Sequence, residues 1–307
     1  MAKPLDTADF RAFRIVLEPD DFAVSDGKPD GPTELVDKDT WHGIVDLPDD
    51  VSIRTSNHQG TILKELYTLQ STWTTHAIGD EQDLLFEVLL YTIDELDAAL
   101  FNVLHGYYRQ AIGCLRNMVE LVLLGTHCQM AQDTTLFEQW QAGHYENSFG
   151  GTCTFLLQHA PVQALNAFLH STVNDTIIDR RNAPQSGGWA RRLYAELCEY
   201  SHSRPNATNV GLWRSNGPIY VPRAFMITAS LYAEPLAFCY LLIKLVRPAL
   251  TLPKAVEEQL ASYQQEESMW VAYQSYRRLF FTVEREQGNN GEVHHTKSSP
   301  MRHEERT

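Results

Sequence analysis

The sequence predicts an all-α fold, a multi-helix bundle preceded by a small irregular or β-containing N-terminal segment. Three observations predict it. From about residue 58 onward, apolar residues recur every three or four positions, as one face of a helix requires. Residues typical of helix starts and ends separate these stretches. The hydrophobic content of 43% and the aromatic content of 10% are those of a chain that builds a core.

The first 57 residues differ from the rest in being rich in Asp and Pro. They hold the short β-branched runs "FRIVLEP", "HGIVDLP" and "VSIRT", separated by turn signals such as "SDGKPDGP". We therefore expect residues 1–57 to be an irregular segment packed on the body. The helical bundle domain is predicted at 58–284, and the polar tail at 285–307 is predicted to be disordered.

Each expected helix carries its own signal. In the first, Ile62, Leu66, Leu69 and Trp73 lie on one face, and a later one is interrupted before Pro161. The string "FGGTC" at 149–153 is expected to be a loop. The predicted helices lie at 61–77, 80–106, 107–132, 134–147, 152–173, 189–202, 223–247 and 253–284.

Composition narrows the classes of function. A formal net charge of −14 disfavours a surface built wholly to bind nucleic acid, although it allows one basic patch. Five scattered cysteines without a CxxC pair predict reduced thiols, a cytoplasmic location, and neither a metal site nor a cofactor. The apolar stretch 224–250 contains Glu234 and Pro235, so we expect a buried core helix and no membrane span.

The helix expected at 107–132 carries a narrow polar stripe on an apolar rod. Arg109, Arg116, Glu120 and His127 are seven, four and seven positions apart, which places them within about 40° around the axis. The stripe faces either a polar cleft or buried partners. Arg116 and Glu120 can also pair with each other at this spacing, which is a structural alternative to a functional role.

A second group of candidates surrounds the helix expected at 189–202. Residues 179–223 contain seven arginines against three acidic residues, a local charge of +4 in an acidic chain. Arginines among aromatic residues suit phosphates and stacked bases. We single out Arg191, Arg192 and Arg204 as phosphate contacts. His202 either caps the last carbonyls of the helix or transfers protons.

With "YRQAIGCLRNMVELVLLG" followed by "LYAELCEYSHSRP", the sequence resembles bacterial all-helical proteins related to the HEPN superfamily. Arg116 and Glu120 match the R-x-x-x-E element of that group. Tyr194, Leu197 and His202 match its second element, in which Cys198 replaces the usual Ser. The R-x(4–6)-H spacing of active HEPN ribonucleases is not present, because the next histidine after Arg116 is His127.

The resemblance implies a homodimer that acts as a metal-independent ribonuclease in a defence or toxin–antitoxin system. In that ribonuclease Arg116 and Glu120 would lie at the centre of the site, and His202 would transfer the proton. Arg109 and Tyr194 would join the arginines in binding RNA or a nucleotide. A separately encoded protein partner is also compatible with such a system. The alternative is a non-catalytic helical interaction or sensor module whose polar stripe is structural.

Overall fold

The all-α prediction is confirmed in a computed structural model, which describes residues 36–79, 84–144, 148–179, 187–201, 217–262 and 270–280. Two compact units divide the chain, 1–46 and 47–307. In the described part of the first unit, a short helix α2 (Lys38–Trp41) is followed by the π-helical turn η2 (His42–Asp46). The Asp37 carboxylate begins α2 by accepting hydrogen bonds from the backbone N–H groups of Asp39 and Thr40.

The β-containing N-terminal segment is wrong for residues 38–57, which are helical. The long helix α3 (Leu47–His76) includes the whole "VSIRT" run, and the boundary expected at 57 falls inside it. Local β propensity is a weak and context-dependent preference. Pro48 and the acidic Asp49 and Asp50 in the first turn also favour a helix start, a signal that the β reading passed over.

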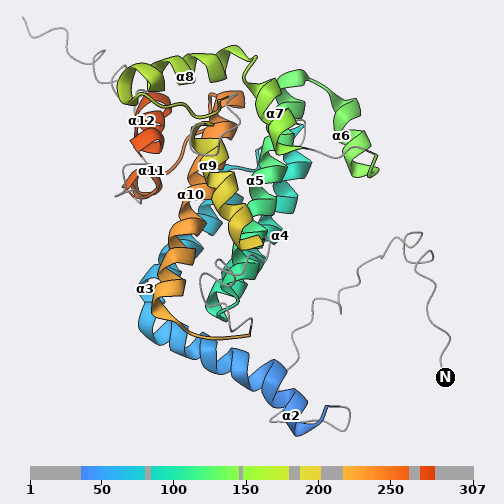
Figure 1. Cartoon of the computed structure of the whole chain (residues 1–307), viewed down its shortest axis with the longest axis vertical. Helices are drawn as coiled ribbons and strands as arrows, with labels where there is room; N and C mark the ends of the chain where they lie inside the picture. Colours follow the sequence, from blue (N-terminus) through green and yellow to red (C-terminus); the bar gives the residue numbers. More distant parts are fainter. Residues whose placement is uncertain are drawn as a thin grey trace, which may run out of the picture. The chain divides into compact units, whose positions relative to one another are not determined.

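The second unit is built from helices that follow one another along the chain (Figure 1). After α3 these are α4 (Leu85–Leu104), α5 (Tyr108–Ala131), α6 (Thr134–Gln141), α7 (Phe149–Leu156), α8 (Ala160–Val173), α9 (Gly188–Ser201), α10 (Pro222–Val246), α11 (Lys254–Ser262) and α12 (Trp270–Leu279). Within the helix expected at 253–284 the structure describes α11 and α12, and residues 263–269 between them lie outside the described residues. The tail expected at 285–307 lies outside the described residues, as do residues 1–35 of the expected N-terminal segment.

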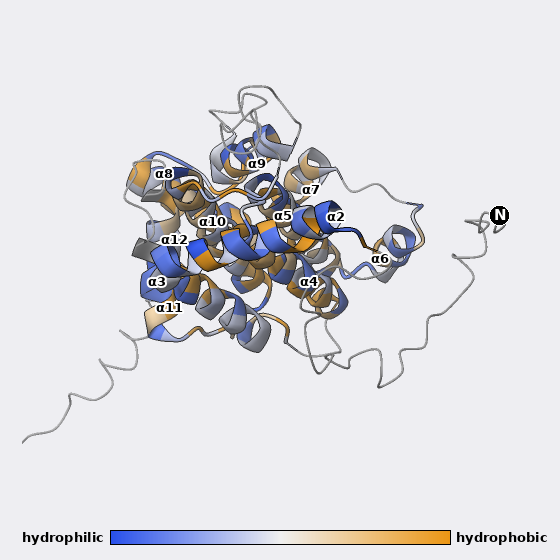
Figure 2. Ribbon diagram, turned by 90° about the horizontal axis from the view of Figure 1, so that it is seen from below, coloured by the Kyte–Doolittle hydropathy of each residue, from blue (hydrophilic) through white to orange (hydrophobic). Residues whose placement is uncertain are grey.

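The central helix of the bundle is α5, which packs against α4, α10, α9 and α7. Its apolar residues Ile112, Leu115, Val119 and Val122 are fully buried in one core. In Figure 2 hydrophobic residues gather toward the middle of the bundle, and hydrophilic residues cover much of α3. The prediction that α5 is an apolar rod with a narrow polar stripe is confirmed.

The long apolar helix α10 is buried nearly all round. It is long and apolar enough to cross a membrane by length and composition, yet 78% of its most apolar window is buried inside the bundle. Its Glu234 carboxylate accepts a hydrogen bond of 2.7 Å from the indole N–H of Trp189 on α9. A charged residue on a buried helix needs a hydrogen-bond partner inside the protein, and Glu234 has one. The prediction that this stretch is a buried core helix agrees with the structure.

A tight turn joins α4 to α5 beneath the chain that leads into α10. Gly106 adopts a left-handed conformation with φ +76°, and a Cβ there would lie 2.3 Å from the carbonyl oxygen of Ile219. The Tyr108 hydroxyl accepts a hydrogen bond from the backbone N–H of Val221. The glycine is required both by the backbone conformation and by the close approach of another segment.

The "FGGTC" string is a helix, which corrects the expected loop. Ser148 caps α7 by accepting a hydrogen bond from the N–H of Gly151. Thr152, Cys153 and Leu156 are buried. Packing against α5 offsets the roughly 1 kcal/mol that each glycine costs relative to alanine in a helix.

Candidate functional site

The helices α5 and α9 pack side by side and run in opposite directions. Arg116 on α5 contacts Tyr194 in the middle of α9, whereas Arg109, two turns earlier on α5, contacts Tyr200 and Ser201 at the end of α9. The sequence element around Arg116 and the one around Tyr194, which together carry the HEPN resemblance, are therefore in contact. The contact is between Arg116 and Tyr194.

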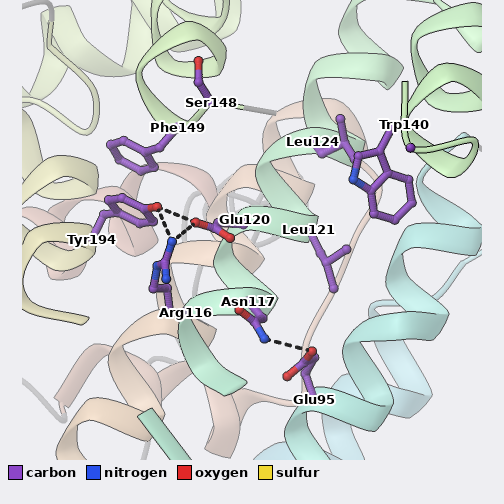
Figure 3. A pocket seen from close by; sticks show the side chains of 11 residues that line it. Glu95, Arg116, Asn117, Glu120, Leu121, Leu124, Trp140, Ser148, Phe149 and Tyr194 are labelled. Atoms are coloured by element: carbon purple, nitrogen blue, oxygen red, sulfur yellow. Dashed lines mark hydrogen bonds and ion pairs between the residues drawn. The ribbon is translucent and has the colours of Figure 1, made fainter. Parts of the chain in front are cut away.

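At this contact three polar side chains form one hydrogen-bonded group. The Nη2 of Arg116 donates to Glu120 Oε1 at 2.8 Å and to the Tyr194 hydroxyl at 3.0 Å. The same Glu120 oxygen accepts a short hydrogen bond from the Tyr194 hydroxyl. Figure 3 shows the three side chains converging from the two helices. Arg116 and Glu120 are one turn apart on α5, which brings the guanidinium to the carboxylate. Tyr194 reaches the same carboxylate oxygen from α9.

An aromatic ring extends this group toward α7. Phe149, the first residue of α7, stacks on Tyr194 with ring centroids 4.0 Å apart and planes 7° from parallel. The guanidinium carbon of Arg116 lies 5.4 Å from the centroid of the Tyr194 ring, within cation–π range. Because its ring and its hydroxyl are both engaged, Tyr194 is held in one orientation.

The electrostatics keep Arg116 charged and Tyr194 neutral at neutral pH. Burial tends to lower the pKa of Arg116, but the hydrogen bond to Tyr194 and the charge of Glu120 together raise the pKa above its usual range. Burial and the hydrogen bond to Glu120 raise the pKa of Tyr194. The Tyr194 phenol is therefore a hydrogen-bond donor here and a poor proton donor to a substrate.

The three side chains line a cavity of about 790 Å³. Figure 3 shows its two unlike sides, with Arg116, Glu120, Tyr194 and Phe149 on one and Leu121, Leu124 and Trp140 on the other. The polar side chains of the first side come from α5 and α9, and the Phe149 ring of α7 lies with them; the apolar side comes from α5 and α6.

Glu95 on α4 forms a further edge of the cavity. The Asn117 amide donates to Glu95 Oε1 at 3.3 Å. The Cys114 thiol lies next to the same carboxylate, and its pKa is raised to about 11, first by burial and then by the charge of Glu95 and the hydrogen bond to it. A thiol with so high a pKa stays protonated near neutral pH, so Cys114 is no nucleophile there.

Arg109, predicted to bind substrate, does not line the cavity. Its Nε and Nη2 donate to the carbonyl oxygens of Tyr200 and Ser201 at 3.1 and 3.2 Å. These carbonyls belong to the last described turn of α9. Arg109 therefore ties α5 to that turn. It lies roughly 10 Å along the α5 axis from Arg116, because seven residues rise about 1.5 Å each.

The other arginines predicted within residues 179–223, and His202, either lie away from the cavity or fall outside the described residues. Arg192 forms an ion pair with Asp175 at 2.5 Å, which ties α9 to the segment after α8. Arg191 lies close enough to Cys153 to lower the pKa of that thiol slightly, although burial raises it to about 12 overall. His202 and Arg204 lie outside the described residues.

His127, the last residue of the polar stripe, is likewise not part of the cavity lining. Its ring stacks on Phe155 with centroids 3.8 Å apart, and burial together with nearby His159 lowers its pKa. One stripe on α5 thus meets different partners along its length.

The sequence reasoning missed Glu95, Asn117, Trp140 and Phe149. The available signals were local ones, such as Ser148 as a helix cap before Phe149, and none of them indicates which distant residue a side chain will face. Among the residues that the structure describes, no three His, Cys, Asp or Glu side chains come together as metal ligands.

No family model, curated protein or solved structure matches the chain.

Proposed function

We propose that this chain is a helical sensor module that binds a small organic molecule in the cavity between α4, α5, α6, α7 and α9. The observation that carries the proposal is the cavity itself, about 790 Å³ with one polar and one apolar side. Ligand sites in proteins are concave, enclose about 300–1,000 Å³, and combine an apolar lining with a few placed polar groups.

The position of the cavity supports a sensing role. Its lining comes from the central helix α5 and from the starts or ends of shorter helices, among them Phe149 at the start of α7 and Trp140 in the last turn of α6. A ligand that contacts both sides at once would favour one arrangement of α6 and α7 against α5. That difference in contacts is how a ligand shifts a conformational equilibrium.

The polar group suits binding better than catalysis. Holding a phosphate in a transition state requires a cation directed at the developing charge. Arg116 is already bonded to Glu120 and Tyr194 on the same nitrogen, and its charge is compensated by the adjacent carboxylate. The Tyr194 hydroxyl is also engaged with Glu120. These groups form a preorganised surface for a ligand.

The experiment is equilibrium dialysis of the purified protein against a bacterial metabolite extract, followed by mass spectrometry of what is retained. The informative variant is Leu121→Trp, which places an indole in the cavity. The matched control is Ile53→Trp, at an exposed site on α3. We expect one or a few compounds to be retained by the wild type and by the control, and lost from Leu121→Trp at unchanged melting temperature. Retention of nothing by the wild type, or equal retention by Leu121→Trp, would contradict the proposal.

A second candidate function is an RNA-acting or nucleotide-binding protein of a bacterial defence or stress system, cytoplasmic and homodimeric, with HEPN-like ancestry. It is favoured by the contact of Arg116 and Glu120 with Tyr194, because these residues match the two separate sequence elements of that group. The sequence makes His202 its proton-transfer candidate.

The test of this second candidate is RNA integrity in cells that express the wild type or His202→Ala at equal levels. RNA cleaved by the wild type alone would establish a ribonuclease and displace the sensor proposal. RNA intact in both strains would count against the ribonuclease.

A further inference from the structure

We propose that the ligand of the cavity is an organic cation with a planar ring, of the class of aryl-alkyl amines or amidines. The inference rests on the proposed function and goes beyond it by naming the chemistry of the ligand. It is carried by the charges on the cavity lining together with its aromatic side chains.

The first step is the charge balance of the lining. Three lining side chains are ionisable near neutral pH, and two of them, Glu95 and Glu120, are carboxylates against the one cation Arg116. Arg116 and Glu120 form an ion pair at 2.8 Å. The unbalanced charge is therefore that of Glu95, which gives the described lining a net charge of −1.

The second step is the surroundings of Glu95. Its hydrogen-bond partners are the neutral amide of Asn117, at 3.3 Å, and the thiol of Cys114. Within the part of the chain that the structure describes, Glu95 has no Lys, Arg or His partner. It is half-buried, so solvent screens its charge less than it would on an open surface. A cationic group in the cavity would supply the missing counter-charge.

The third step is the aromatic lining. Trp140 is half-buried, with its indole held at an angle of 70° to the exposed Tyr91 and stacked on Phe137. Leu121 and Leu124 lie beside it (Figure 3). A planar ring fits such a surface, and the face of an indole ring attracts cations by about 0.5–2 kcal/mol.

The same lining disfavours anions. A phosphate or carboxylate ligand would lie close to Glu95 and Glu120, and Arg116 is the single cationic side chain on the described lining. Like charges in a partly buried site repel, and that repulsion excludes competing ligands. The cavity therefore discriminates by charge as well as by shape.

The experiment uses three probes of nearly the same size and ring, which differ in charge. Tryptamine is cationic, tryptophol is neutral and indole-3-acetate is anionic near neutral pH. Their dissociation constants for the full chain are measured by isothermal titration calorimetry. We expect tryptamine to bind at millimolar or lower concentration, tryptophol to bind about tenfold more weakly, and indole-3-acetate not to bind.

Two variants assign the effect to the site. Glu95→Gln removes the unbalanced charge with little change in shape, and we expect it to weaken tryptamine about tenfold while leaving tryptophol unchanged. The matched control, Asp94→Asn, removes a neighbouring exposed charge that does not line the cavity, and should leave both constants unchanged. Leu121→Trp should abolish binding of both compounds.

The outcomes separate the two proposals. Equal affinities for tryptamine and tryptophol, or full affinity in Glu95→Gln, would overturn the cationic class and leave a ligand cavity standing. Binding of indole-3-acetate in preference would overturn it in the same way. If no probe binds at millimolar concentration, the ring-cation class is wrong, and the dialysis experiment decides separately whether the cavity binds anything.

Discussion

The two ends of the α5–α9 interface use the same residue type in different ways. At one end Arg109 donates to two backbone carbonyls of the last α9 turn. At the other end Arg116 donates to the side chains of Glu120 and Tyr194 at the edge of a cavity. Both arginines lie on one stripe of α5. Their roles are set by what α9 presents to each, a backbone end in one case and a phenol in the other.

The comparison separates stability from recognition. Carbonyls at a helix end have no partner within the helix, so an arginine that binds them holds that end in place. The Arg116–Glu120 pair is 25% and 34% exposed, and pairs with such access to water contribute little to stability. We therefore expect the Arg109 end to matter for folding and the Arg116 end to matter for the ligand.

The largest effect on the free energy of unfolding should come from removing the apolar contact that lies between the Arg109 and Arg116 ends of the α5–α9 interface. Leu197 on α9 is fully buried, so Leu197→Ala should lower the free energy of unfolding by about 2–5 kcal/mol. Urea unfolding measures this change. Leu90→Ala, at an exposed site on α4, is the control and should change it by less than about 0.5 kcal/mol. A similar loss in both variants would mean that α9 is not anchored by this contact.

The next effect should be confined to the Arg109 end. Arg109→Met keeps much of the side-chain volume and removes both hydrogen bonds, which should cost about 1.5–3 kcal/mol. Amide hydrogen exchange should accelerate in the last turn of α9. Unchanged protection there, or faster exchange spread evenly along α9, would show that Arg109 does not hold that turn in place.

A smaller effect on stability should follow Arg116→Met, about 1 kcal/mol, because solvent reaches both members of the ion pair. Its effect on binding should have the opposite sign to that of Glu95→Gln, since a more negative cavity should bind tryptamine more tightly. Thermal unfolding and calorimetry on the same preparation check both. A loss of stability greater than that of Arg109→Met would reverse the comparison between the two ends.

A comparably small effect on the free energy of unfolding, about 0.5–1.5 kcal/mol at neutral pH, should follow Tyr194→Phe, because it removes one hydroxyl and keeps the ring stack on Phe149. The pH dependence is more specific. The pKa of Tyr194 is higher in the folded protein than in the unfolded chain, where it is near 10. The contribution of the Tyr194 hydroxyl to the free energy of unfolding is therefore complete below pH 10 and is lost as the pH rises above 10. Denaturant unfolding between pH 8 and pH 11 should show a steeper alkaline loss in the wild type than in Tyr194→Phe, and parallel curves would contradict this.

Much of the bundle could be predicted from the sequence, because long periodic patterns outweigh local ambiguity. Leu66, Leu69 and Trp73 are fully buried on one face of α3, and the helix interruption before Pro161 is found where expected. The prediction failed where the pattern was short. Residues 47–57 were interpreted from their β-branched residues, although Pro48 and the acidic residues Asp49 and Asp50 favour a helix start. The α7 segment was interpreted from its glycines, although its Ser148 cap favours a helix.

The candidate site was only half predictable. The i, i+4 spacing of Arg116 and Glu120 predicted their pair, and the resemblance supplied Tyr194. Glu95, Trp140 and Phe149 could not be predicted, since helix packing brings them to the cavity from distant parts of the chain. Arg109 lies on the predicted stripe, and its bonds to backbone carbonyls could not be predicted, because backbone atoms carry no sequence signal. Its predicted role in binding substrate stays a prediction.

Two glycines in the left-handed conformation differ in how readily another residue could replace them. Gly106 lies under the chain that enters α10, with Ile219 backbone atoms where any side chain would have to go. Gly143 lies at the rim of the cavity with φ +70° and open space around it, so Asn, which tolerates that conformation, can replace it. A substitution of Gly143 should therefore alter the cavity rim without disturbing the bundle, whereas a substitution of Gly106 should displace the chain that enters α10.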